Sequence, residues 1–139
     1  MRFQPARKAI ILVFLSGLAA QIGLALTSYC LKQIFVDELT TIIVNLLQVY
    51  SVHLAVVLST AFFSDTSRNA KLNGTVFIAS ISLIVLWNLL LITRLVLFIL
   101  PQKDNIDLLI NFQKDIAANS NFLIAGLIAY FFSVKGKSS

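Results

Sequence analysis

The chain has 139 residues, of which 58% are hydrophobic and only 12% are charged. Soluble domains carry roughly 25% charged residues, so this composition excludes an ordinary water-soluble surface. A helix needs ~20 apolar residues to cross the hydrocarbon core of a bilayer, and four crossings would use most of the chain. We therefore expect an all-α fold, an integral membrane four-helix bundle in which residues 1–139 form one domain.

Charge and cysteine content narrow the expected partners. The net charge is +5, but Lys and Arg are not clustered on a soluble element, so no nucleic acid is expected. The basic residues instead fit membrane topology and contact with anionic lipid headgroups. Cys30 is the only cysteine, which excludes an internal disulfide and a multi-cysteine metal site. No cofactor is expected.

Four apolar segments predict spans at approximately 10–31, 39–63, 75–100 and 117–134. Prolines fall outside these segments or at their ends, as expected because proline within a helix removes a backbone hydrogen bond. A cleaved signal peptide is an alternative for the first segment, but the Leu-Ala-Ala sequence at 18–20 is a poor cleavage site. We therefore expect the first helix to be retained.

The segment 104–116 has an amphipathic pattern. Asp104 is a candidate helix cap, and Asp107 is favourable near a helix N-terminus. Two alternatives stay open. The segment lies flat in the outer interface, or it runs into the fourth span as one helix longer than the ~30 Å core.

Basic residues are distributed unevenly between the two expected sides. The two termini and the second loop hold seven of the eleven basic residues and one of the six acidic residues. The opposite side holds three basic and five acidic residues. The positive-inside rule therefore places both termini in the cytoplasm, with the chain in the cell inner membrane. The glycosylation sequon at 73–75 then falls on the cytoplasmic side and is discounted.

Arg94 is the most informative residue because a guanidinium within a span is costly. In one interpretation it reaches the outer headgroups with its long side chain. In the other it pairs with Asp37 or Glu38, which begin the second span on the same side. In the third span, which also contains Arg94, Asn88 is a further polar group that needs a partner. Trp87 lies near the centre of this span, where it is expected to pack between helices.

The second span carries a polar stripe of Thr41, Asn45, Gln48 and Ser59 at helical spacing. The stripe either forms hydrogen bonds to neighbouring helices or lines a pore. His53 is the only histidine, and packing is preferred to a role in proton or metal chemistry.

Small residues follow one face of the first span: Ser16, Ala20, Gly23 and Thr27. Such faces let helix backbones approach closely, as in small-xxx-small interfaces. A bundle this small has little room for both a core and a site, and symmetric assembly is a common solution. We therefore expect a homo-oligomer.

Function is less constrained than topology. No membrane-buried Asp or Glu and no catalytic or phosphate-loop pattern is present, so an enzyme is not expected. The preferred hypothesis is a membrane-resident sensor or scaffold in a small bacterial multi-gene system, for example phage defence. An acidic soluble protein would dock on Arg68, Lys71, Lys135 and Lys137. A channel or pore-forming effector is the alternative, and an immunity or holin-like protein is a third, weaker one.

Overall fold

The computed structural model describes residues 3–63, 74–100 and 105–133, and it describes the side chains of residues 5–51, 53–55, 74–100, 105–120 and 122–127. Within these ranges the chain forms four helices and no strand: α1 (Phe3–Cys30), α2 (Val36–Phe63), α3 (Gly74–Ile99) and α4 (Ile106–Ser133). The predicted all-α class is confirmed. The first helix begins about two turns earlier than the apolar segment alone predicts, because the residues before Ile10 continue the same helix.

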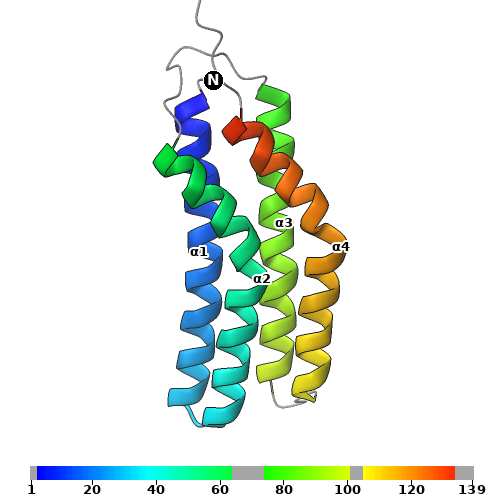
Figure 1. The fold of residues 1–139 in the computed structure, drawn as a ribbon. Helices are drawn as coiled ribbons and strands as arrows, with labels where there is room; N and C mark the ends of the chain where they lie inside the picture. Colours follow the sequence, from blue (N-terminus) through cyan, green and yellow to red (C-terminus); the bar gives the residue numbers. More distant parts are fainter. Residues whose placement is uncertain (1–2, 64–73, 101–104, 134–139) are drawn as a thin grey trace, which may run out of the picture.

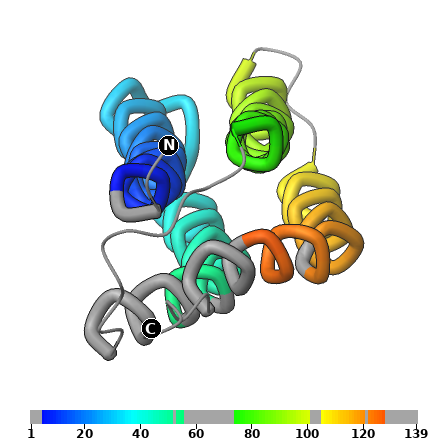
Figure 2. Tube along the Cα trace, turned by 90° about the horizontal axis from the view of Figure 1, so that it is seen from above, coloured from blue at the N-terminus to red at the C-terminus, as the bar shows by residue number. Residues whose placement is uncertain are grey.

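The helices stand side by side and alternate in direction along the chain (Figure 1). Helix α1 packs against α2 and α3, and α4 also packs against α2 and α3. Viewed along the helices, α2 and α3 therefore face each other across the centre (Figure 2). The parallel pair α1 and α3 are neighbours, and so are the parallel pair α2 and α4. Any direct link between α2 and α3 has to be made by long side chains.

The turn between α1 and α2 is fixed by local hydrogen bonds. The amide of Gln33 donates to the carbonyl of Ser28 at 2.9 Å, and Lys32 adopts a left-handed φ of 58°. This is the Schellman arrangement that commonly ends helices. At the start of α2, the Phe35 amide donates to the Glu38 carboxylate at 2.8 Å. That bond is half of a capping box, so Glu38 stabilises the first turn of α2.

Helix α4 is one continuous helix of 28 residues. At 1.5 Å per residue it is ~42 Å long, which exceeds the ~30 Å hydrocarbon core. Residues 106–116 and the predicted fourth span therefore belong to one helix, and how that helix lies in a membrane stays a prediction. The expected cap, Asp104, lies outside the described residues, and the Asp107 amide donates instead to the side-chain oxygen of Asn105 at 2.9 Å.

The exterior of the structure is strongly apolar. Leu12, Ile78 and Phe122 are 70%, 65% and 70% exposed, although each lies within a helix. Conversely, polar side chains are buried between the helices, namely Gln21, Asn45, His53, Asn88 and Gln113. Two helices, Pro5–Cys30 and Gly74–Ile99, are long and apolar enough to cross a membrane. Helices α2 and α4 carry more of the polar side chains.

Candidate functional site: a polar centre between three helices

Three buried polar side chains meet near the middle of the structure, and we call Gln21, Tyr50 and Asn88 the polar centre. Nε2 of Gln21 donates to the Tyr50 hydroxyl at 2.6 Å, and this hydroxyl donates to Oδ1 of Asn88 at 2.5 Å. The residues come from α1, α2 and α3, respectively. The polar centre therefore joins α2 to α3 across the structure and ties both to α1.

Two further hydrogen bonds fix the orientation of the amides. Nδ2 of Asn88 donates to the carbonyl of Ile84 at 2.9 Å, and Nε2 of Gln21 donates to the carbonyl of Gly17 at 3.3 Å. With its amide nitrogen held by the backbone, Asn88 presents its oxygen to Tyr50. A buried hydrogen bond contributes ~0.5–1.5 kcal/mol net, whereas a buried group left unpaired costs ~1–3 kcal/mol. The polar centre therefore favours one helix arrangement over others.

Gly17 provides the space that Asn88 needs. A Cβ atom placed on Gly17 would lie 1.7 Å from Oδ1 of Asn88. No real contact is that short, so any other residue here would displace the Asn88 side chain from α1. Glycine is required at this position because α3 brings a side chain close to the α1 backbone.

Aromatic rings enclose one side of the polar centre. The Trp87 ring lies 5.0 Å from the Tyr50 ring and 5.8 Å from the Phe14 ring, measured between centroids. The His53 ring lies 5.5 Å from Trp87 and 5.6 Å from Phe14. Trp87 packs between helices, as its central position in the sequence predicts. His53 is thus packed among aromatic rings on α1 and α3.

A second buried polar pair joins α2 to α4. Nδ2 of Asn45 donates to Oε1 of Gln113 at 2.5 Å. Oδ1 of Asn45 and Nε2 of Gln113 have no hydrogen-bond partner among the described residues. Asn45 belongs to the polar stripe predicted for the second span, whereas Gln113 was not identified from the sequence.

The structure divides that polar stripe. Asn45 is buried, while Thr41 and Gln48 are exposed on either side of it. Together with Lys114 of α4 they border a shallow cavity of about 290 Å³ on the outside of the α2–α4 seam. Ser59 has no described side chain. Within the described part of one chain, the stripe therefore follows a seam between helices.

Arg94 lies half-buried near the end of α3, with its guanidinium carbon 5.7 Å from the centre of the Phe112 ring. This geometry is a cation–π contact, which links α3 to the lower part of α4. Asp37 is exposed, and Glu38 accepts the capping hydrogen bond described above. Pairing of Arg94 with either carboxylate stays a prediction.

The small-residue face of α1 points outward. Ser16, Ala20, Gly23 and Thr27 are all exposed, and a Cβ on Gly23 would meet no atom within 4 Å. Ser16 and Thr27 donate their hydroxyls to carbonyls of their own helix. This face is thus available to a second molecule. The four basic residues predicted to dock a partner, Arg68, Lys71, Lys135 and Lys137, lie outside the described residues.

The two glycines of α1 allow a matched test of the polar centre. Gly17→Ala should lower the thermal unfolding midpoint, because the new Cβ displaces Asn88 and breaks its bond to Tyr50. The expected loss is about 1–3 kcal/mol. Gly23→Ala should be neutral or slightly stabilising, because its Cβ meets open space and alanine favours the helix. Circular dichroism of both variants in mild detergent measures this, and equal midpoints for the two variants would contradict the role of Gly17.

Known proteins give no guide to this site. No protein-family model, no curated protein and no solved structure matches the chain. Among the described residues, no group of three or more His, Cys, Asp or Glu side chains is placed to hold a metal ion. The hydrogen bonds of the polar centre hold α1, α2 and α3 in a defined relative position.

Proposed function

We propose that the chain is a non-enzymatic polytopic membrane protein that acts as a sensor or scaffold in a bacterial inner membrane. The observation that carries this proposal is the inversion of polarity: hydrogen-bonded amides inside, and large apolar side chains outside. In lipid, polar groups have to be satisfied within the protein, and outward Leu and Phe side chains cost nothing. In water, the same exterior would form an apolar surface far larger than soluble monomers carry.

All four helices cross the bilayer in this proposal. Helices α2 and α4 lie beside α1 and α3 along their length (Figure 1). Their outer faces also carry exposed apolar side chains, including Val44 and Leu47 of α2 and Phe122 and Leu123 of α4. Their buried residues Asn45 and Gln113 bond to each other, which gives one polar atom of each amide a partner inside the protein. Packing thus allows α2 and α4 to enter the hydrocarbon despite their more polar sequences.

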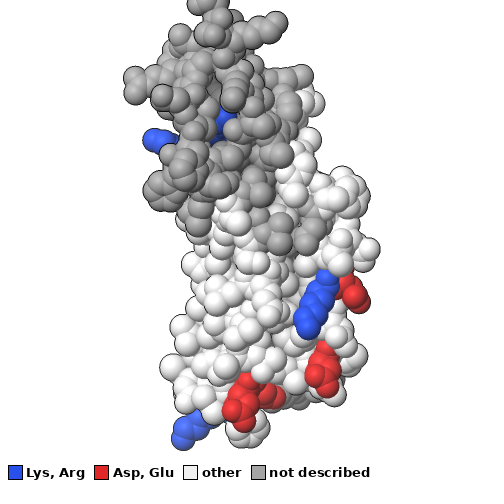
Figure 3. Space-filling model, in the orientation of Figure 1, with Lys and Arg blue, Asp and Glu red and all other residues white. Residues whose placement is uncertain are grey.

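Charge supports one orientation. Acidic side chains gather at the end of the structure where α1 passes into α2 and where α4 begins (Figure 3). Arg7 and Lys8 lie at the opposite end, near the start of α1. The positive-inside rule then places the start of α1 and the end of α4 on the cytoplasmic side.

Reporter fusions test this topology. Fusions after residues 69 and 139 should report a cytoplasmic location, and insertions at 35 and 108 should report a periplasmic one. The reason is the uneven charge distribution together with four crossings. A periplasmic signal from the fusion at residue 139 would show that the number of crossings is odd or that the orientation is reversed.

Self-association is the second part of the proposal. The outward face of α1 that contains Ser16 and Gly23 offers a smooth surface for a second copy, since small residues let helix backbones approach closely. Ser16→Leu or Gly23→Leu should therefore reduce the number of copies seen by native mass spectrometry in mild detergent. Leu15→Ile, on a different exposed face of α1, serves as the control. A monomeric wild-type protein at several detergent concentrations would refute self-association.

Recruitment of a soluble partner is the third part. The cytoplasmic segments are short and basic, so they suit an acidic protein whose approach is guided by charge. Reversing Arg68 and Lys71 to Glu should abolish co-purification of products of neighbouring genes. Membrane insertion, checked by fractionation, should be unchanged, because the spans are untouched. Co-purification that survives the double reversal would place the docking surface elsewhere.

A pore remains the second candidate function, and one observation favours it. The cavity bordered by Thr41, Gln48 and Lys114 opens outward, so several copies arranged with these faces together would bring polar side chains to a shared passage. Within one chain, the interior is instead filled by large side chains such as Phe14, Tyr50 and Trp87. We prefer the sensor or scaffold for this reason. Ion flux through liposomes containing the purified protein separates the two functions.

A further inference from the structure

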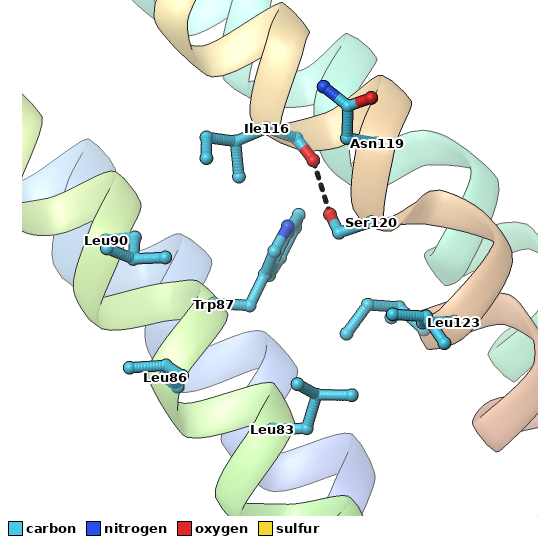
Figure 4. A pocket seen from close by; sticks show the side chains of 9 residues that line it. Leu83, Leu86, Trp87, Leu90, Ile116, Asn119, Ser120 and Leu123 are labelled. Atoms are coloured by element: carbon cyan, nitrogen blue, oxygen red, sulfur yellow. Dashed lines mark hydrogen bonds between the residues drawn. The ribbon is translucent and has the colours of Figure 1, made fainter.

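A cavity of about 160 Å³ lies between α3 and α4 and is lined on the α3 side by Trp87 (Figure 4). Its walls are mainly apolar and include Leu83, Leu90 and Leu123. Two polar residues of α4, Asn119 and Ser120, also border it. An apolar cavity of ~150 Å³ is large enough to bind a single benzene ring.

Trp87, which lines this cavity, has a buried polar atom without a partner. Its side chain is only 3% exposed, and its Nε1 has no hydrogen-bond acceptor among the described residues. Figure 4 shows the indole projecting from α3 toward α4, with its nitrogen on the part of the ring near Ile116 and Ser120. The Ser120 hydroxyl already donates to the Ile116 carbonyl at 2.5 Å. A buried indole N–H normally finds a partner, so this N–H lacks the acceptor that it would be expected to have.

The indole is held rigidly in this position. Its ring contacts those of Phe14, Tyr50 and His53, and Tyr50 is fixed in turn by the polar centre. Reorienting the indole to find another acceptor would disrupt these contacts. The cavity is therefore pre-formed, as ligand sites usually are.

We propose that this cavity binds a membrane-soluble small molecule with a ring-sized group and a carbonyl oxygen that accepts a hydrogen bond from Nε1 of Trp87. The remainder of the molecule would pass between exposed leucines such as Leu86 and Leu90 into the lipid. If the chain is a sensor, this molecule is its signal.

The depth of Trp87 in the membrane makes such a molecule a better ligand than a phospholipid. This step rests on the proposed membrane crossing. Trp87 is thirteen residues from Gly74 and twelve from Ile99, which corresponds to ~20 and ~18 Å along the helix. It therefore lies near the middle of a ~30 Å core, whereas phospholipid ester oxygens lie at the core boundary. An acyl chain would fill the cavity but leave the indole N–H without an acceptor.

Trp87 is the only tryptophan, so the full-length protein gives a single indole N–H signal in a ¹H–¹⁵N spectrum. We would titrate the purified protein in mild detergent with acetophenone, and separately with ethylbenzene, which has a similar shape but no acceptor. Acetophenone should shift the indole proton downfield and saturate, because a hydrogen bond forms. Ethylbenzene should bind more weakly, by about five- to tenfold, and should cause no downfield shift.

Two variants locate the binding. Ser120→Leu places a larger side chain in the cavity and should weaken acetophenone binding by about tenfold or more. Leu12→Phe adds similar bulk on the outward face of α1 and should leave binding unchanged. The wild-type titration stands even if Ser120→Leu does not fold.

Three results would overturn the proposal: a shift that does not saturate, an equal downfield shift with both compounds, or unchanged binding in a folded Ser120→Leu variant. The first result would mean partition into detergent only. Because the titration reports on the cavity in detergent, its outcome does not depend on how many helices cross a bilayer. Failure of this proposal is thus distinguishable from failure of the proposed topology.

Discussion

The hydroxyl of Tyr50 holds the structure in one arrangement, because it accepts from Gln21 and donates to Asn88 at the same point. Helices α2 and α3 face each other across the centre, and hydrogen-bonded side chains have to span that distance. Apolar side chains could fill the same volume but would allow the helices to slide or rotate. In lipid, where helix association has no hydrophobic driving force of its own, directional contacts of this kind select one register. The close approach at Gly17 is a consequence of the same geometry.

The distribution of polarity follows from this constraint. Helices α1 and α3, which contain the two segments apolar enough to cross a membrane, contribute the two amides of the polar centre, while α2 and α4 share the pair Asn45 and Gln113. Each buried amide on one helix is thus matched by a polar side chain on another. The exposed surface of each helix includes large apolar side chains, such as Leu12, Val44, Ile78 and Phe122. In this way a sequence with only 12% charged residues gives several of its buried polar atoms a partner within the protein.

Composition and spacing were sufficient to predict the helical class, because long apolar segments without internal proline have few alternatives in lipid. They also identified Asn45 and Asn88 as polar groups that need partners, although not the partners themselves. Tyr50 and Gln21 were missed because a lone tyrosine reads as an apolar aromatic, and Gln21 falls outside the small-residue face chosen on α1. Helix α1 in fact has a glycine on each of two faces: Ser16, Ala20 and Gly23 face outward, whereas Gly17 and Gln21 face inward. Only the spatial order of the helices distinguishes them, and nothing in the short connecting segments encodes which helix becomes the neighbour of α1.

Trp87 connects the two sites that the structure contains. Its ring packs against those of Tyr50 and His53, and it also borders the cavity between α3 and α4. Interiors packed in this way respond to a displaced side chain by shifting between discrete arrangements rather than by deforming smoothly. A molecule that bound the indole N–H would restrain the same ring that supports the Tyr50 hydroxyl, and hence the helices joined by the polar centre. A bound ligand would then act on both α2 and α3 through one side chain, since Tyr50 lies on α2 and Trp87 lies on α3.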